Sequence, residues 1–326
     1  TAPQEDENIK TVLDGVISKL SPSKVEYVRG CAIRDTTVNE IAEVVEAASR
    51  SEVIIAVVGG SSARDFKTSY QETGAAIADE KSISDMECGE GFDRATLTLL
   101  GKQQDLLNAL KATGKPLIVV YIEGRPLDKV WASEYADALL IASYPGQEGG
   151  YAIADVLFGD YNPAGRLPVS VPRSVGQIPV YYNKKAPCNH DYVEQAASPL
   201  YTFGYGLSYT TFEYSDLQVM RKSPCYFEVS FKVKNTGSYD GEEVAQLYLR
   251  DEYASVVQPL RQLKCFERFF LKRGEEKEIF FTLTEKDLSI IDRNMKRVVE
   301  TGDFRIMIGA SSDDIRLTKD ISVESL

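Results

Sequence analysis

Residues 53–60, with the sequence VIIAVVGG, decide the fold of the first half of the chain. The run is apolar and rich in β-branched residues, and two glycines end it. These features are typical of a parallel strand that is buried on both faces. A helix with an acidic first turn is expected before it, up to about residue 50, and residues 25–28 have the pattern of a short strand. The sequence therefore predicts a strand–helix–strand unit.

The same alternation continues further along the chain. Apolar residues have helical spacing at 102–113, 127–135 and 147–158, and strands are predicted at 116–121 and 138–142. Alternating strands and helices predict a doubly wound, mostly parallel sheet with helices on both faces, that is, an α/β sandwich. In such sheets ligands bind outside the carboxyl ends of the strands. We assign residues 1–205 to this α/β domain.

The pattern changes after about residue 205. Short runs of alternating apolar and polar residues, separated by turn signals, occur at 227–233, 244–249, 277–283 and 304–308. A period of two with frequent turns predicts an all-β, antiparallel sandwich of immunoglobulin or fibronectin type III-like architecture. We assign residues 206–326 to this second domain and expect it to give structural support.

Charge and composition exclude several classes of function. The formal net charge of −12 disfavours nucleic acid and anionic membrane surfaces as partners. No apolar run is long enough to span a bilayer. The five cysteines are scattered and His190 is the only histidine, so we expect no metal site, and His190 is expected at the surface or lining a site. The polar residues 1–7 resemble a linker, so the chain is expected to be a mature or excised piece of a longer protein.

One long connection carries the candidate site. More than thirty residues separate the strand at 53–58 from the next helix, whereas about two to six are usual, and loops of this length tend to be functional or disordered. Near its end lies DMECGEGFDR, residues 85–94. Glycines on both sides of Glu90 would let a loop present its carboxylate to a cavity. Glu87 and Asp85 are rival carboxylates, and a solvated acidic loop is the alternative. The glycines form no phosphate-binding pattern, which disfavours a nucleotide or flavin binder.

Four further stretches carry a resemblance to a known family. They are, in order, GQEGG (146–150), AIADVLFG (152–159), NPAGRLP (162–168) and FGYGLSY (203–209). Through them the chain closely resembles glycoside hydrolase family 3 over almost its whole length. What it resembles is the carboxyl-terminal two thirds of such enzymes, the α/β-sandwich domain and the fibronectin-like domain. No residue matches the aspartate nucleophile of the family's amino-terminal (β/α)8 barrel.

The resemblance implies a role for each candidate residue. Members of the family carry their general acid/base in a Gly-Glu-Gly-aromatic-Asp-Arg setting, which residues 89–94 match, with Glu90 as the acid/base. This group protonates the leaving glycosidic oxygen and then deprotonates a water, opposite a carboxylate nucleophile. Asp93 and Arg94 resemble a structural pair that holds the loop. Glu87 is a further candidate for substrate binding or loop support.

The resemblance also implies an activity. We expect the C-terminal portion of a retaining exo-β-glycosidase that hydrolyses terminal non-reducing β-D-glucosyl or xylosyl residues, without metal or organic cofactor, and that is periplasmic or secreted. Its partners would be an oligosaccharide or β-glycoside substrate and the missing barrel domain. Without that barrel the chain alone is expected to be inactive. A non-catalytic carbohydrate-binding or scaffolding fragment is the alternative.

Overall fold

The computed structural model describes residues 8–62, 69–74, 76–77, 84–89, 91–185 and 190–324. The chain forms two compact units, each with its own core. The first comprises Thr1–Tyr161 and Pro172–Ile178, and the second comprises Asn162–Val171 and Pro179–Leu326. The segments 162–171 and 179–205, which we had assigned to the first domain, thus lie in the second unit. The physical reason is their packing there: Gln246 Nε2 donates to the carbonyl of Gly204 at 3.2 Å.

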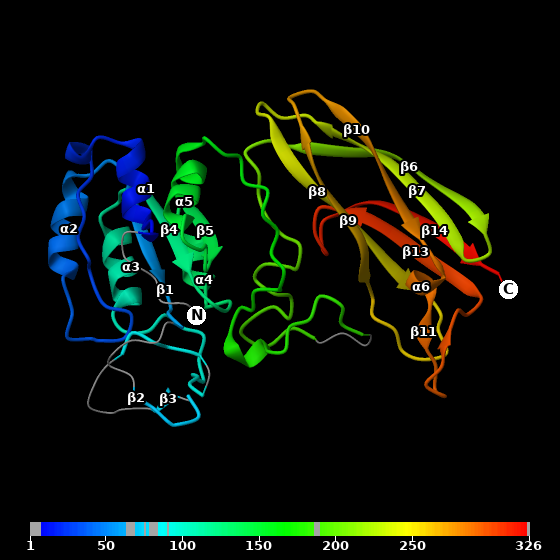
Figure 1. The fold of residues 1–326 in the computed structure, drawn as a ribbon, viewed down its shortest axis with the longest axis horizontal. Helices are drawn as coiled ribbons and strands as arrows, with labels where there is room; N and C mark the ends of the chain where they lie inside the picture. Colours follow the sequence, from blue (N-terminus) through cyan, green and yellow to red (C-terminus); the bar gives the residue numbers. More distant parts are fainter. Residues whose placement is uncertain are drawn as a thin grey trace. The chain divides into compact units, whose positions relative to one another are not determined.

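A parallel sheet with helices on both faces forms the first unit, as predicted (Figure 1). Its strands follow the order β1 (Ile54–Gly59), β4 (Leu117–Ile122) and β5 (Ala138–Ser143), and all pairings are parallel. Helices α1 (Val12–Lys19) and α5 (Gly149–Phe158) pack on one face through a core that includes Val120. The opposite face is covered through the core around Val119 by α2 (Ile41–Arg50), α3 (Gln103–Ala112) and α4 (Val130–Tyr135).

The predicted strand at 25–28 is wrong. A short 3₁₀ helix, η2 (Pro22–Lys24), precedes these residues, which are extended at Val25 but belong to no strand of the described structure. Tyr27 is 65% exposed, so its ring does not gain the burial against a sheet that stabilises a strand. The first strand–helix–strand unit is therefore β1, α3 and β4. A hairpin of β2 (Ser69–Tyr70) and β3 (Ala76–Ile77) lies within the long connection between β1 and α3.

The side chain of Gln103 binds the backbone at the carboxyl end of β1. The backbone N–H of Gly59 donates to Gln103 Oε1 at 2.7 Å, and Gln103 Nε2 donates back to the Gly59 carbonyl at 3.0 Å. Gln103 is the first residue of α3, so its amide links the last residue of β1 to the first residue of α3. Gly59 has φ of 146°, and a Cβ there would lie 1.8 Å from the carbonyl oxygen of Ile122, so only glycine fits.

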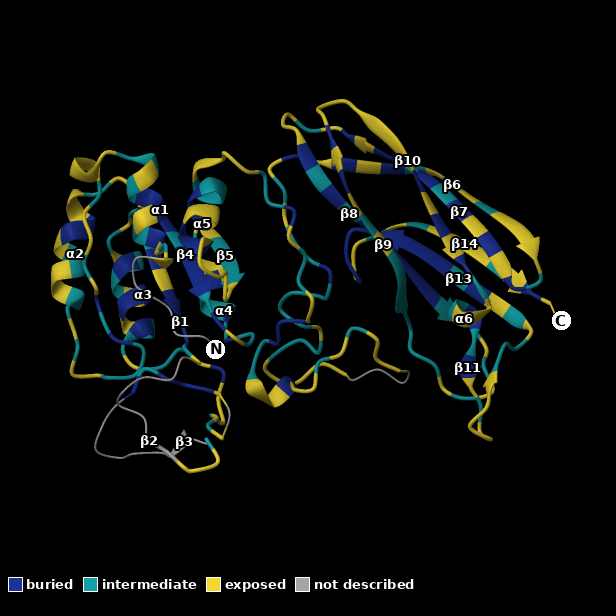
Figure 2. Ribbon diagram, viewed as in Figure 1, coloured by how far each residue is buried: buried dark blue, intermediate teal, exposed yellow. Residues whose placement is uncertain are grey.

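The second unit is an antiparallel β-sandwich, as predicted. One sheet has the order β10-β7-β6 and the other β14-β13-β8-β9. Buried and exposed residues alternate along the strands (Figure 2), and the buried ones, such as Phe231 and Leu247, meet in one core. The strands are β6 (Phe212–Ser223), β7 (Tyr226–Asn235), β8 (Gly241–Asp251), β9 (Gln262–Leu271), β10 (Glu276–Leu283), β13 (Gly302–Gly309) and β14 (Ile315–Val323). Short elements complete the fold: η3 (Val175–Gln177) in the first unit, and α6 (Glu285–Leu288) and the hairpin of β11 (Ile290–Ile291) and β12 (Arg297–Val298) in the second.

Candidate active site

The carboxyl ends of β1, β4 and β5 share one edge of the sheet. The described residues of 85–94, which we call the acidic segment, lie against this edge. Ser61, which follows β1, forms a parallel bridge with Met86 and accepts a hydrogen bond from the backbone of Glu87 at 2.8 Å. Glu123 directly follows β4, and Tyr144, which follows β5, lies near Ser62. Segments that are distant from β1 in the sequence therefore meet at its carboxyl end, which is where ligands bind in sheets of this kind.

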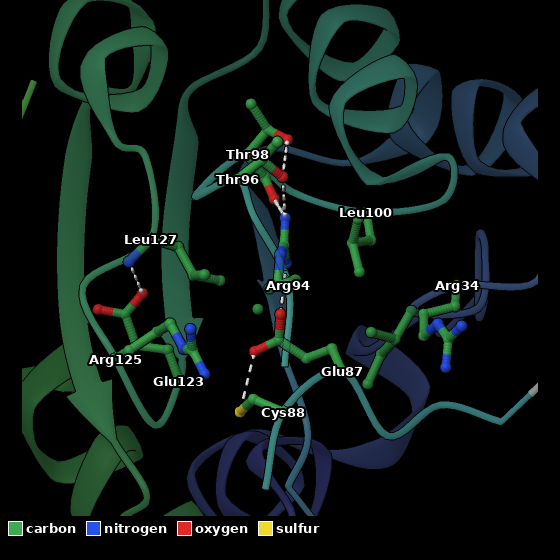
Figure 3. A network of polar contacts seen from close by, with 12 residues as sticks. Arg34, Glu87, Cys88, Arg94, Thr96, Thr98, Leu100, Glu123, Arg125 and Leu127 are labelled. Atoms are coloured by element: carbon green, nitrogen blue, oxygen red, sulfur yellow. Dashed lines mark hydrogen bonds and ion pairs between the residues drawn. The ribbon is translucent and has the colours of Figure 1, made fainter. Parts of the chain in front are cut away.

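Glu87 is a buried carboxylate whose oxygens are occupied. Its side chain is 0% exposed and forms an ion pair with Nη1 of Arg94 (Figure 3). The Cys88 thiol donates to Glu87 Oε1 at 3.5 Å, and a Cβ on Gly60 would lie 2.3 Å from the same oxygen. Arg94 also donates to Thr96 Oγ1 at 3.2 Å and to the carbonyl of Thr98. A buried charge that is paired in this way stabilises the local structure and is shielded from a ligand.

The carboxylate of Asp93 pairs with Arg125 and not with the guanidinium of Arg94. Nη1 of Arg125 lies 2.7 Å from Asp93 Oδ1, and the backbone N–H of Arg94 donates to the same oxygen at 2.8 Å. These two donors, the backbone N–H first, lower the pKa of Asp93 below its ordinary value. Arg125 comes from the loop between β4 and α4, and nothing in the sequence had marked it as part of the site.

Glu90 lies outside the described residues, but the backbone on both sides of it is described. Gly89 and Phe92 exchange two backbone hydrogen bonds, of 2.8 and 3.2 Å. Gly89 has φ of 153° and Gly91 has φ of 72°, conformations that favour glycine. Both glycines thus have the unusual backbone conformations that the sequence suggested, while the presentation of the Glu90 carboxylate stays a prediction. Arg34 adds a further contact, because its guanidinium lies 5.3 Å from the centroid of the Phe92 ring.

A second buried ion pair, also missed from the sequence, holds the β4–α4 loop. Lys129 Nζ lies 2.6 Å from Glu123 Oε2 and donates to the carbonyl of Leu127 at 2.9 Å. The same Glu123 oxygen accepts the backbone N–H of Leu127 at 3.1 Å, and the ammonium lies 4.6 Å from the centre of the Tyr121 ring. Burial raises the pKa of Glu123 and lowers that of Lys129. The sequence predicts a helix at 127–135, and that pattern contains no signal that Lys129 is buried or paired with Glu123.

The other acidic, histidine and cysteine residues considered from the sequence differ in exposure. Asp85 is half-buried, and His190 is exposed. Cys88 is a buried free thiol, and Cys188 lies outside the described residues. Within the described ranges, no group of three or more His, Cys, Asp or Glu side chains could hold a metal ion, and no helix is both long and apolar enough to cross a bilayer.

Comparisons with known proteins give the family. A family model described as the glycosyl hydrolase family 3 C-terminal domain matches residues 3–209, and a fibronectin type III-like domain model matches residues 243–312. A β-xylosidase of Formosa agariphila is 40% identical over 316 residues, which are 94% of this chain and 40% of that protein. The periplasmic β-glucosidase of Salmonella typhimurium is 43% identical over 292 residues, 85% of this chain and 35% of that protein.

Solved structures agree with these relatives. A β-glucosidase of Erythrobacter marinus matches 96% of this chain with 43% of its own, at 35% identity and a TM-score of 0.83. A β-glucosidase of Listeria innocua, in complex with laminaribiose, matches 98% of this chain with 42% of its own, at 30% identity and a TM-score of 0.83. The chain thus spans less than half the length of these relatives. It belongs to glycosyl hydrolase family 3, where it corresponds to the C-terminal domain and the fibronectin type III-like domain.

Proposed function

We propose that this chain supplies the general acid/base, Glu90, to a retaining exo-β-glycosidase whose nucleophile belongs to a barrel domain outside this chain. The substrates are terminal non-reducing β-D-glucosyl or xylosyl residues. Membership of the family supports this proposal, as do relatives named β-xylosidase and β-glucosidase. The relative from Salmonella typhimurium is named periplasmic, which supports a periplasmic or secreted location for this protein.

The observation that carries the choice of Glu90 is that the two neighbouring carboxylates are already paired with arginines. Glu87 is buried against Arg94, and Asp93 pairs with Arg125. A general acid/base must exchange its proton with a glycosidic oxygen and then with water, so it needs a carboxyl group that substrate can reach. Of the carboxylates at 87–93, only Glu90 has glycine on both sides, and it matches the motif position of the family.

The proposed chemistry divides between two carboxyl groups. Glu90, protonated, donates its proton to the leaving oxygen while the nucleophile of the barrel attacks the anomeric carbon. Glu90, now ionised, accepts a proton from the water that hydrolyses the glycosyl intermediate. The described part of this chain contributes the backbone on both sides of Glu90, which Gly89 and Phe92 hold by their paired hydrogen bonds.

The test is Glu90→Gln in the complete enzyme. Turnover of natural glycosides should fall by about 10²- to 10⁴-fold. Aryl glycosides with good leaving groups should lose much less, because their leaving group needs no proton. Azide should restore turnover of the intermediate by replacing the activated water.

Glu87→Gln is the matched control. It removes the charge that pairs with Arg94, so we expect a loss of stability and a similar loss of rate on both kinds of substrate. If Glu87→Gln showed azide rescue and Glu90→Gln did not, the assignment of the acid/base would be wrong.

A further inference from the structure

One guanidinium contacts residues on both sides of the glycine-flanked turn. Arg125 Nη1 lies 2.7 Å from Oδ1 of Asp93, which follows the turn, and the same guanidinium lies near the thiol of Cys88, which precedes it. Figure 3 shows Arg125 extending from its loop toward the segment that holds Glu87 and Cys88. Both ends of the turn therefore lie next to the same side chain.

We propose that Arg125 is a positioning residue for the general acid/base: it fixes both ends of the Gly89–Phe92 turn and so sets where the carboxyl group of Glu90 acts. The inference rests on the proposed function of Glu90. Arg125 itself touches neither substrate nor reacting atoms in this proposal, and it acts through Asp93 and Cys88.

The turn needs such an anchor because its own backbone restrains it weakly. Gly89 and Gly91 have more accessible backbone conformations than any other residue type, so ordering them costs more entropy. Within the turn, the two backbone hydrogen bonds between Gly89 and Phe92 oppose this freedom. The contacts that Arg125 makes from outside the turn, with Asp93 and near Cys88, restrict the turn further.

Arg125 can serve as an anchor because its own loop is held rigidly. It lies between Glu123 and Lys129, whose side chains are 4% and 0% exposed and 2.6 Å apart. Glu123 also accepts the backbone N–H of Leu127, so the loop is tied at three points around Arg125. A planar guanidinium can pair with a carboxylate while another of its edges faces a second group, and an ammonium in the same place lacks this fork.

A purely structural role predicts a different result. Asp93 is 67% exposed and Arg125 28%, and ion pairs that are open to solvent contribute little to stability. Loss of Arg125 should therefore leave the fold intact while it lowers the efficiency of proton transfer. A structural role would lower stability and all activities together.

The experiment compares Arg125→Ala, Arg125→Lys and Asp93→Asn with Arg125→Ala/Asp93→Asn in the complete enzyme. In Arg125→Ala, kcat for natural glycosides should fall about 10- to 100-fold, because small misplacement of a catalytic group is costly. KM should stay within about 3-fold, and Tm within about 3 °C. The loss should be smaller on aryl glycosides with good leaving groups. Arg125→Lys should restore only part of the rate, and the double variant should be no worse than the worse single one.

Arg50→Ala is the matched control, since Arg50 is an ion-paired arginine of the same unit, bound to Glu26 and Glu46. It should leave kcat for both kinds of substrate unchanged. Amide exchange at Gly91 and Phe92 gives a readout without activity: Arg125→Ala should accelerate it in the chain, and Arg50→Ala should not.

Two outcomes overturn the inference. One is equal loss of kcat on both substrate classes together with a lower Tm; the other is unchanged kcat and unchanged amide exchange in Arg125→Ala. If Glu90→Gln behaves as a loss of the acid while Arg125→Ala does nothing, only the role of Arg125 is wrong. If Glu90→Gln has no effect, the proposed function is wrong, whatever Arg125 does.

Discussion

Three arginines hold the acidic segment, one through a backbone carbonyl and two through carboxylates. Arg34 donates to the carbonyl of Met86 at 2.8 Å, Arg94 binds the carboxylate of Glu87, and Arg125 binds that of Asp93. The guanidinium group is always charged and offers several donors in one plane, so it can neutralise a carboxylate and satisfy backbone oxygens at once. At the residue scale the segment is thus ordered mainly by charge-assisted hydrogen bonds.

The pKa of Asp93 reports directly on one of these contacts. In the folded chain it lies below the ordinary 3.8, because the Arg94 backbone N–H and then Arg125 donate to the ionised form. A folded pKa below the unfolded one gives stability that is present above pH 3.8 and lost as the pH falls through the folded value. In Arg125→Ala we expect this pKa to rise toward 3.8 but to stay below it, since the Arg94 N–H remains.

Carboxyl-detected NMR titration of the chain would measure the change, with Asp93→Asn used to assign the resonance. A pKa of Asp93 that is the same with and without Arg125 would contradict the ion pair.

Sequence reasoning at this scale identified the conformations but not the partners. The two glycines around Glu90 indicated an unusual backbone, and the structure has it. Asp93 and Arg94 were grouped as a pair through the family resemblance, but the side chains of adjacent residues point in different directions along an extended chain. Their partners, Arg125 and Glu87, depend on how distant segments meet, which no local pattern encodes.

At the scale of elements, the β4–α4 loop is stabilised by ionic side chains that are fully enclosed. Glu123 and Lys129 each have a pKa shifted toward the neutral form by burial. Mutual attraction and their bonds to Leu127 offset the loss of hydration, so the pair is stable only while it is complete.

We expect Lys129→Met to lower the free energy of unfolding of the first unit by about 3–5 kcal/mol, since Glu123 would be left buried without a counter-charge. Glu123→Leu/Lys129→Met should recover much of this loss. The chain has a single tryptophan, Trp131 in α4, so its fluorescence during urea denaturation reports on this unit.

The control is Lys102→Met, which breaks the exposed pair with Asp105 and should cost at most about 1 kcal/mol. A Lys129→Met variant no less stable than Lys102→Met would show that the buried pair is unimportant.

Elements were predicted well where burial alone decides them. The run at 53–58 became β1 within one residue, because a strand covered on both faces must be apolar throughout. Residues 25–28 failed because a strand also needs a neighbour to pair with, and that information lies outside the segment. Strands β6, β9 and β14 were not located, since polar residues interrupt their alternation and weaken the signal.

At the scale of the whole molecule, we expect the isolated chain to have no measurable glycosidase activity. The covalent step needs a carboxylate opposite the acid, and no residue here matches the family's nucleophile. Purified chain should be assayed on aryl β-glucosides and β-xylosides beside a full-length relative. Turnover close to that of the relative would overturn the proposed division of the catalytic pair between domains.

The extent of the two units could not be read from sequence. The described part of this segment, residues 179–185 and 190–205, contains no helix or strand, so it carries no periodic signal that would assign it to either unit. Their place is set by side-chain contacts within the second unit, such as that of Tyr182, whose ring meets the ring of Tyr248 in β8 edge-on with centroids 6.1 Å apart. The family model nevertheless ends at residue 209, so the unit of sequence descent and the unit of packing differ.

The amide of Gln103 affects which changes in length the connection from β1 to α3 can accept during evolution. It binds both backbone groups of Gly59, so the start and the end of the connection from β1 to α3 are joined by a side chain that belongs to neither strand nor loop. Closing a longer loop costs little, only about 0.6 kcal/mol for each doubling of its length. Insertions and deletions in the connection therefore leave its two ends in place. Descendants of this gene can lengthen or shorten the connection that carries the acidic segment while the sheet beneath it stays the same.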